Sequence, residues 1–234
     1  MQAIKTVFID IDDTLWYFTQ NSKVAFRHVY DTMGLAAVCA HYDRFHDIYL
    51  KHNARLWHSY HHGEIDRDFL KTERFRVTLE EAGYRGDCLA LGNDMDKEYL
   101  RYLATLPTLV PGAKQLLEYL NERGYDVNVL SNGFTEVQER KLLSGGVRHL
   151  VHHLVLSDDC GITKPQRGIF DYALAVAHAQ PETTVMIGDD PDTDIVGAHR
   201  AGWKTIYFDL RGIPPTPGTA TATVSTLDEV TRLL

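Results

Sequence analysis

Short apolar runs alternate with longer amphipathic stretches over most of the chain. The apolar runs favour β-branched and aromatic residues, which is typical of strands buried in a sheet. They lie at 5–10, 125–131, 152–157, 184–189 and 204–209. Stretches with apolar residues every three to four positions follow them, at 112–124, 135–146, 166–179 and 192–202. This alternation predicts right-handed βαβ units and an α/β fold whose parallel sheet is covered on both faces.

Residues 17–107 show a different pattern, without a convincing strand. Four amphipathic stretches, separated by glycines or polar turns, predict helices there. Candidate N-caps are Asn21 or Ser22 and Asp66 or Asp68. We therefore predict a helical insertion at 17–107 in a core formed by 1–16 and 108–234. In that core, the Pro-, Thr- and Gly-rich stretch 214–223 predicts a surface loop before a final helix.

Composition and charge narrow the class of protein. The chain of 234 residues is 44% apolar, and no apolar run approaches the roughly 18 residues that span a bilayer. Its beginning runs from Met1 into a strand pattern without the features of a signal peptide. Cys39, Cys88 and Cys160 are odd in number and widely spaced, which predicts reduced thiols and a cytoplasmic protein. The net charge of −8 argues against nucleic acid or an anionic membrane as partner.

Three aspartates follow the first predicted strand, at Asp10, Asp12 and Asp13. Two carboxylates about 4 Å apart repel by roughly 4 kcal/mol at an effective dielectric near 20. Such a pair suits chemistry in which Asp10 attacks an electrophile and Asp12 acts as acid and base, provided that their surroundings differ. The alternative is an Asx-turn or a helix cap, which is the favoured interpretation for Asp13 alone.

A second acidic group, "GDDPDTD" at 188–194, follows the fourth predicted strand. A calcium loop of EF-hand type is excluded, because the glycine and the final acid that it needs are missing. A magnesium site needs only one or two carboxylates, and Asp189 at the strand end suits a direct ligand. Asp194, in the first turn of the next helix, suits a supporting role. Asp190 and Asp192 are interpreted as helix caps rather than metal ligands.

Ser131 and Lys164 lie near the ends of two further predicted strands. In a parallel sheet the carboxyl ends of the strands meet at one edge, where ligands bind. The Ser131 hydroxyl, with Asn132 and the backbone after it, can hold a phosphoryl oxygen, and Lys164 offers a point charge to phosphate. Each signal is weak by itself, because "SNG" is also an ordinary turn and most lysines lie at the surface.

In chain order, these residues resemble the four motifs of the haloacid dehalogenase superfamily. The motifs are Asp10-x-Asp12-x-Thr14, Ser131, Lys164, and Asp189 with Asp194. The resemblance implies a Rossmann-like core with an inserted helical cap. It also implies phosphoryl transfer with Mg²⁺ through an aspartyl-phosphate. True dehalogenases of the superfamily lack the second aspartate, so Asp12 favours phosphatase chemistry.

The resemblance also implies a role for each site residue. Asp10 would be the nucleophile and Asp12 the acid and base. The predicted metal ligands are Asp10, the backbone carbonyl of Asp12, and Asp189, with Asp194 supporting them. The predicted phosphate-binding residues are Ser131, Asn132, Lys164 and Thr14.

Further segments are similar to the YjjG-type pyrimidine 5′-nucleotidases. They are 56–65, 131–142, 164–174 and the closing "VSTLDEVTRLL". This similarity predicts a small phosphorylated metabolite as partner, a pyrimidine nucleoside monophosphate, and a monomer or homodimer. Trp16, Trp57 and Tyr60 could stack on a base, with packing inside the helical insertion as the alternative.

Other interpretations stay open at this point. Within the superfamily, the chain could be a sugar-phosphate phosphatase or a phosphomutase. A phosphorylatable signalling domain also uses clustered acids, a hydroxyl and a lysine, but is usually near half this length. A regulatory protein with an inactive site is disfavoured, because every expected catalytic position is filled. The histidines near Glu64 suit a polar helix end better than a zinc site; they are His58, His61 and His62.

Overall fold

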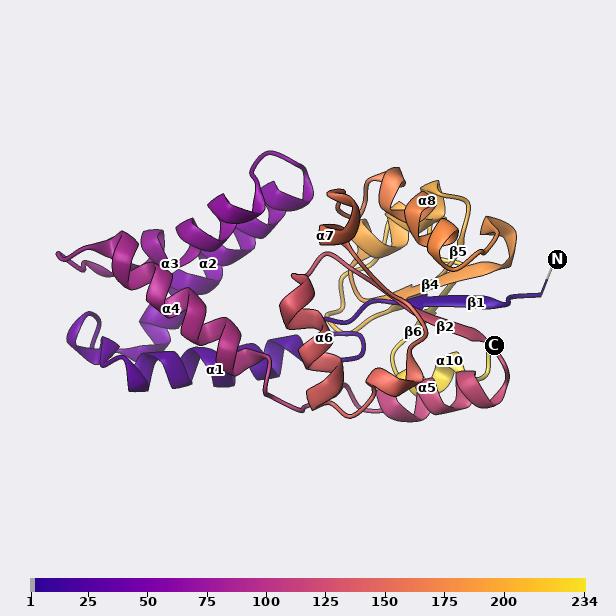
Figure 1. Ribbon diagram of the computed structural model, residues 1–234, viewed down its shortest axis with the longest axis horizontal. Helices are drawn as coiled ribbons and strands as arrows, with labels where there is room; N and C mark the ends of the chain where they lie inside the picture. The colour runs from indigo at the N-terminus through magenta and orange to yellow at the C-terminus, as the bar shows by residue number, and fades with distance from the viewer. Residues whose placement is uncertain (1–2) are drawn as a thin grey trace. The chain divides into compact units, whose positions relative to one another are not determined.

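The computed structural model describes residues 3–234, which divide into two compact units. The first unit comprises the chain up to Phe18 together with Leu106–Leu234, and the second comprises Thr19–Thr105 (Figure 1). Residues 1 and 2 of the predicted core lie outside the described residues. The division into a catalytic core and a cap at 17–107 stays a prediction.

The first unit contains a six-stranded parallel sheet in the order β3-β2-β1-β4-β5-β6. The predicted α/β fold with a parallel sheet is therefore confirmed, and its strand order is that of a doubly wound Rossmann-like sheet. The strands are β1 (Thr6–Ile9), β2 (Asp126–Ser131), β3 (Leu154–Leu156), β4 (Thr184–Gly188), β5 (Lys204–Phe208) and β6 (Ala222–Val224). Every residue of β1 is buried, as expected for a central strand covered on both faces.

The edge strand β6 corrects the prediction of a loop over 214–223. Residues 222–224 pair with Ile206, Tyr207 and Phe208 of β5, and only Val224 of the three is buried. A three-residue strand with one buried side chain has no apolar alternation, so the pattern could not reveal it. Threonines strengthen this edge, because the Thr205 Oγ1 hydroxyl donates to the backbone oxygen of Thr219 at 2.6 Å.

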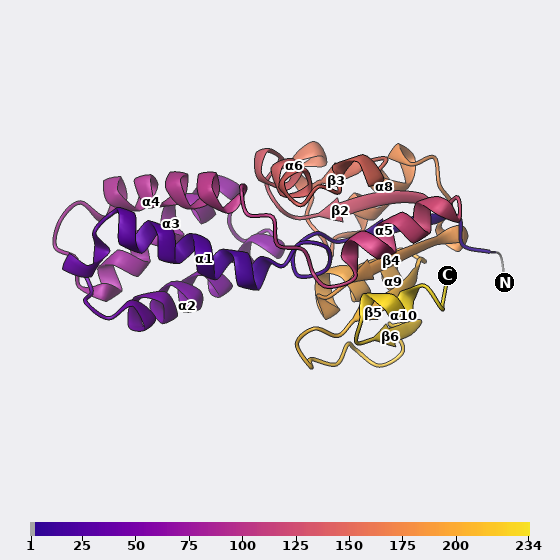
Figure 2. The same ribbon diagram turned by 90° about the horizontal axis from the view of Figure 1, so that it is seen from below.

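Helices cover both faces of the sheet in two layers. In Figure 1, α5 (Ala113–Glu122) and α10 (Leu227–Val230) lie below the sheet and α8 (Arg167–Val176) lies above it. Figure 2 shows α5 and α10 from below. The remaining helices of this unit are α6 (Thr135–Ser144), α7 (Ser157–Cys160) and α9 (Gly197–Arg200). The four helices predicted between 112 and 202 and the predicted final helix all exist, although the stretch at 192–202 begins as a π-helical turn, Pro191–Val196.

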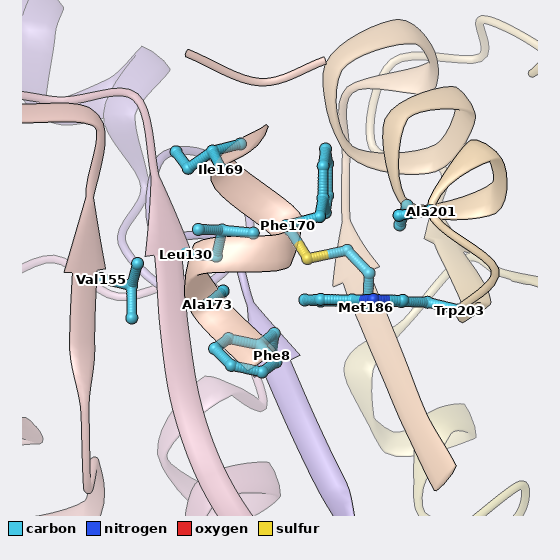
Figure 3. Packing of buried hydrophobic residues seen from close by; sticks show 10 residues of the cluster. Phe8, Leu130, Val155, Ile169, Phe170, Ala173, Met186, Ala201 and Trp203 are labelled. Carbon is cyan, nitrogen blue, oxygen red and sulfur yellow. The ribbon is translucent and has the colours of Figure 1, made fainter. Parts of the chain in front are cut away.

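The largest side chains between α8 and the sheet form one apolar cluster (Figure 3). Phe8 of β1 and Phe170 of α8 pack on Trp203, with ring centroids 5.0 and 5.3 Å apart. Met186 of β4 and Leu130 of β2 also belong to the cluster, and none of these five side chains is more than 3% exposed. Burial of this size, worth roughly 1.5–3 kcal/mol for each large side chain, stabilises the packing of α8 on the sheet.

The second unit consists of four helices, of which α3 packs against both α2 and α4. They are α1 (Phe18–Thr32, whose first residue belongs to the first unit), α2 (Tyr42–His61), α3 (Arg67–Ala82) and α4 (Cys88–Leu103). Asp66 caps α3 as predicted, because its side chain accepts a bond from the backbone N–H of Phe69. The predicted cap of α1 was wrong, because Asn21 and Ser22 lie buried inside that helix. The Ser22 hydroxyl contacts the hydroxyl of Tyr99 at 2.7 Å, a tertiary contact that the local sequence does not indicate.

A buried ion pair crosses the interior of this helical unit. Arg74 Nε donates to Asp96 Oδ1 at 2.7 Å, and both residues are at most 4% exposed. The aromatic rings of Phe75 and Tyr99 flank the guanidinium at 5.4 Å. The pair joins α3 to α4, and it would be costly to break on one side only.

The strand order places a topological switch point between β1 and β4. From β1 the chain builds the sheet outward through β2 and β3, then returns to the other side of β1 with β4, β5 and β6. Ligands of such sheets bind beyond the carboxyl ends of the strands at this point. Within the described part of the chain, no helix combines the length and the apolar character needed to cross a membrane. Cys39, Cys88 and Cys160 are free thiols.

Candidate active site

Asp10 leaves β1 at the switch point, and a tight loop follows it. Its backbone N–H donates to Ile187 of β4 at 3.0 Å, so the main chain holds it against the neighbouring strand. The carbonyl of Ile11 then accepts bonds from three successive residues, of which Trp16 is the last, at 2.8 Å. Asp13 has φ 59°, the left-handed conformation that aspartate tolerates. The loop therefore turns back at once and keeps Asp10 and Asp12 at one edge of the sheet.

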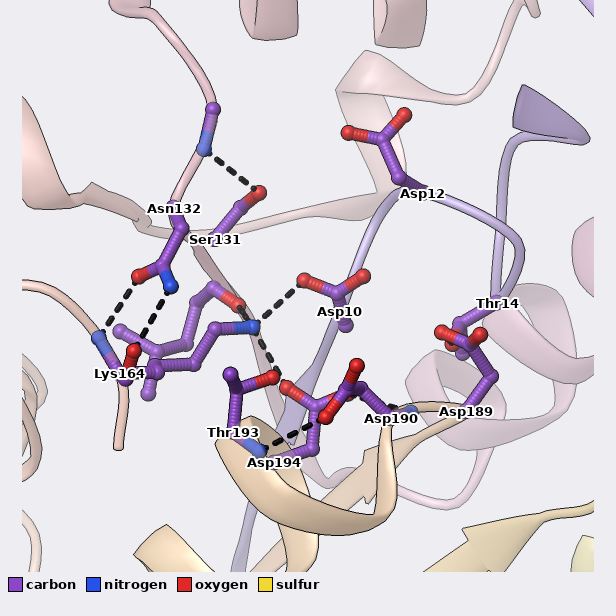
Figure 4. A network of polar contacts seen from close by, with 12 residues as sticks. Asp10, Asp12, Thr14, Ser131, Asn132, Lys164, Asp189, Asp190, Thr193 and Asp194 are labelled. Carbon is purple, nitrogen blue, oxygen red and sulfur yellow. Dashed lines mark hydrogen bonds and ion pairs between the residues drawn. The ribbon is translucent and has the colours of Figure 1, made fainter. Parts of the chain in front are cut away.

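Lys164 lies between two carboxylates beneath this loop (Figure 4). Its Nζ donates to Asp10 Oδ1 and Asp194 Oδ1, both at 2.6 Å, and to the carbonyl of Leu130 at 2.9 Å. The side chain is 3% exposed. Burial by itself would lower the pKa of Lys164, but Asp10 and Asp194 raise it above its usual value, so the lysine stays charged.

Asn132 clamps the loop that carries Lys164. Its Nδ2 donates to the carbonyl of Lys164 at 2.9 Å, and its Oδ1 accepts from the Lys164 N–H at 2.7 Å. Both ends of the amide are thus used on the protein backbone. The structure gives this side chain a positioning role, and the phosphate contact predicted for Asn132 stays a prediction.

Asp189 leaves β4 on the other side of the switch point. Its Oδ1 accepts from the Thr14 hydroxyl at 3.3 Å, and its Oδ2 lies 2.9 Å from Arg211. Thr14 is fully buried and its hydroxyl supports Asp189, while the phosphate contact predicted for Thr14 stays a prediction. The predicted cap Asp190 is confirmed, because its side chain accepts bonds from the N–H groups of Asp192 and Thr193. Arg211, which lies beyond β5, was not among the predicted site residues.

The buried carboxylates are short of positive charge. Burial raises the pKa of Asp10 to about 7, although Lys164 opposes this shift. Burial, and then the negative charges of Asp194 and Asp10, raise the pKa of Asp189 well above its usual range. Lys164 supplies one positive charge among Asp10, Asp189 and Asp194, and Arg211 is shared between Asp189 and Asp190. The cluster therefore favours an additional cation.

The donor set fits a hard divalent cation. Asp10, Asp189 and Asp194 each offer a carboxylate oxygen, and these atoms lie within 4.8 Å of one another. All-oxygen ligands are those that Mg²⁺ prefers. Asp194 lies on the π-helical turn after β4, where Lys164 and the Asp190 N–H hold its two oxygens, whereas Asp10 and Asp189 directly follow the adjacent strands β1 and β4.

Asp12 has different surroundings from Asp10. Figure 4 shows its carboxylate pointing away from Lys164. Lys141 Nζ donates to its Oδ1 at 2.6 Å, and Gln138 Nε2 donates to its Oδ2 at 2.9 Å. Both donors come from α6 and were missed in the sequence. Their spacing of three places them on one helix face, but nothing in the local pattern shows that this face turns toward Asp12.

Ser131, at the end of β2, is arranged as a hydrogen-bond donor. Its Oγ accepts from the Gly133 N–H at 3.2 Å and from Gln138 Nε2 at 2.7 Å. A hydroxyl oxygen has two lone pairs, so both acceptor positions are filled and its O–H is left to donate. This arrangement suits the oxygen of a bound phosphate.

The three aromatic residues predicted to contact substrate do not lie together in one unit. Trp16 is fully buried in the first unit, and its Nε1 donates to the carbonyl of Leu106 at 2.9 Å, so substrate contact does not fit its position. Trp57 and Tyr60 lie on α2 of the helical unit, partly buried, with ring centroids 5.7 Å apart. The histidines near Glu64 are not among the metal-capable group found in residues 3–234.

Comparisons with known proteins agree with this geometry. Residues 4–202 match the family model of the haloacid dehalogenase-like hydrolases. The chain is 28% identical to the pyrimidine 5′-nucleotidase YjjG of Escherichia coli over 97% of its length and 96% of that protein. It is also 28% identical to the glyceraldehyde 3-phosphate phosphatase of Pyrococcus furiosus, over 89% and 82%. The magnesium-bound structure of the HAD-hydrolase YfnB from Bacillus subtilis is 26% identical, with a TM-score of 0.88 over 100% of this chain and 99% of that one.

Proposed function

The chain belongs to the haloacid dehalogenase-like hydrolases, and from this premise we propose that it is a phosphatase that cleaves phosphate monoesters through a phosphorylated Asp10. The contrast between Asp10 and Asp12 carries the proposal. Asp10 is buried in the cation-poor cluster, whereas Asp12 is partly exposed and held by Lys141 and Gln138. Two carboxylates in different surroundings suit two different roles, a nucleophile and an acid–base group.

The proposed reaction has two steps. An Asp10 carboxylate oxygen attacks phosphorus, the bond from phosphorus to the leaving oxygen breaks, and Asp12 donates a proton to that oxygen. Asp12 then accepts a proton from a water that attacks the phosphorylated Asp10, which releases inorganic phosphate and restores the carboxylate. Lys164 and the Ser131 hydroxyl hold the phosphoryl oxygens through both steps.

Mg²⁺ is the proposed cofactor, with Asp10, Asp189 and the backbone carbonyl of Asp12 as its ligands. When bound, it would neutralise charge on the transferred phosphoryl group, which otherwise meets several carboxylates. Asp194 would act on this site by holding Lys164. The magnesium bound in the similar YfnB structure supports this choice of metal.

The metal can be tested by turnover and, independently, by direct measurement of Mg²⁺ binding. We expect a chelator to abolish turnover, and Asp189→Asn to weaken Mg²⁺ binding measured by calorimetry by at least about 100-fold. Loss of a supporting residue alone costs about 10–100-fold in metal affinity. Asp192→Asn is the matched control, because Asp192 is an exposed acid of the same loop. Equal Mg²⁺ affinity in Asp189→Asn and wild type would contradict the ligand role.

The proposed substrates are pyrimidine nucleoside 5′-monophosphates. YjjG, a named pyrimidine 5′-nucleotidase, is similar over nearly the whole of both chains, which supports this class. The glyceraldehyde 3-phosphate phosphatase is similar at the same identity, so a sugar-phosphate phosphatase is the second candidate. The function of the helical insertion as a cap, and of Trp57 and Tyr60 in substrate choice, stays a prediction.

Release of inorganic phosphate from a panel of esters tests the function. We expect steady turnover of p-nitrophenyl phosphate with Mg²⁺, and a higher kcat/KM for UMP, dUMP or dTMP than for AMP, GMP or glyceraldehyde 3-phosphate. A higher kcat/KM for the sugar phosphate would agree with the proposed phosphatase activity and would reject the proposed nucleotidase specificity. A single phosphorylation event without turnover would indicate a signalling domain instead.

A further inference from the structure

The helix α6 reaches the proposed acid–base group with two side chains. Lys141 and Gln138 donate to the two different oxygens of Asp12, at 2.6 and 2.9 Å. A carboxylate bound at both oxygens by donors from one rigid helix has little freedom to rotate. Asp12 itself sits on a loop, and α6 is the helix that fixes its carboxylate.

Lys141 is held in place from its other side as well. Its Nζ lies 4.8 Å from the ring centroid of Trp16 and 5.4 Å from that of Phe18, and its side chain is 4% exposed. An ammonium buried this deeply costs several kcal/mol unless a partner compensates it, and a buried ion pair adds little to stability compared with apolar residues. Fold stability therefore does not account for a charge at this position.

Gln138 joins Asp12 to the phosphate-binding hydroxyl. The same Nε2 that donates to Asp12 donates to Ser131 Oγ at 2.7 Å. The reversed amide would place its oxygen against a carboxylate, so the charge of Asp12 sets the orientation. Gly133 allows the close approach, because a Cβ there would lie 2.1 Å from Gln138 Nε2.

We propose that Lys141 and Gln138 are positioning residues for Asp12, which aim its carboxyl group at the leaving-group oxygen. This inference rests on the proposed function, in which Asp12 donates its proton to that oxygen. After Asp12 has given its proton to the leaving-group oxygen, its carboxylate is anionic and accepts the bonds from Lys141 and Gln138 that the structure shows. Without either donor, Asp12 could still carry the proton, but the proton would be misplaced relative to the leaving-group oxygen.

The proposal predicts a loss that depends on the leaving group. A p-nitrophenolate departs without a proton, whereas the alkoxide of a nucleoside monophosphate needs one. For Lys141→Met we expect kcat/KM to fall about 10²-fold with UMP, the cost of a misplacement of about 1 Å, and much less with p-nitrophenyl phosphate. The value of kcat/KM is the right measure, because it reports the steps up to phosphorylation of Asp10.

Arg140→Met is the matched control, since it removes a positive charge from an exposed position on the same helix. It should leave kcat/KM unchanged for both esters, and thermal unfolding should show that the variants are folded. Gln138→Met is the second test if Lys141→Met does not fold; because Gln138 also donates to Ser131, we expect this variant to lower kcat/KM with both esters, but more with UMP. An equal loss with both esters in a folded variant would overturn the proposal. A wild-type protein that hydrolyses neither ester would instead contradict the proposed function.

Discussion

Asp10→Asn is expected to abolish turnover while leaving the protein folded. The amide has no anionic oxygen to attack phosphorus, so no phosphorylated intermediate can form. Loss of a nucleophile that works as one unit with its neighbours costs on the order of 10⁶-fold in kcat. The fold should tolerate the change, because burial already raises the pKa of Asp10 to about 7 and so disfavours the charge there.

The measurement is the rate of phosphate release, accompanied by circular dichroism and thermal unfolding of each variant. Asp192→Asn again serves as control, since it makes the same chemical change in an exposed acid beyond β4. Mass spectrometry of the wild-type protein, quenched during turnover, should show a phosphoryl group on the peptide that contains Asp10. Asp10→Asn with near wild-type activity would reject Asp10 as the nucleophile.

Lys164→Met is expected to lower both activity and stability. Removal of the ammonium leaves Asp10 and Asp194 as buried carboxylates without the partner that each contacts at 2.6 Å. Breaking one side of a buried ion pair costs about 3–5 kcal/mol. We expect a decrease of this size in the free energy of unfolding, measured by urea denaturation without added metal, together with loss of phosphatase activity.

A second substitution separates the two effects. Lys164→Met combined with Asp194→Asn should recover part of the lost stability, because one uncompensated charge is removed, but it should not recover activity. Lys114→Met is the control, since Lys114 is 54% exposed and its ion pair with Glu118, at 3.8 Å, should contribute at most about 1 kcal/mol. If Lys164→Met were as stable as wild type, Lys164 would not be compensating these carboxylates.

The local sequence pattern was sufficient to predict most helices and strands. It also predicted which edge of the sheet carries the reactive side chains. The apolar runs located five of the six strands, and the polar residues directly after them had to meet because parallel strands share their carboxyl edge. Asp10 and Asp189 follow adjacent strands β1 and β4, and Lys164 reaches the same cluster from the loop between α7 and α8. Burial patterns and strand polarity are properties of short segments, which is why the sequence alone predicted them.

The partners of each side chain were decided only by the tertiary structure. Lys141 and Gln138 look like ordinary residues of an amphipathic helix, yet they contact Asp12 across more than 120 positions of chain. Thr14 and Asn132 lie in the expected motifs, but only the structure shows that their hydrogen bonds support Asp189 and the Lys164 loop. Such roles depend on which distant segments the fold brings into hydrogen-bond contact. The local sequence pattern contains no information about these contacts.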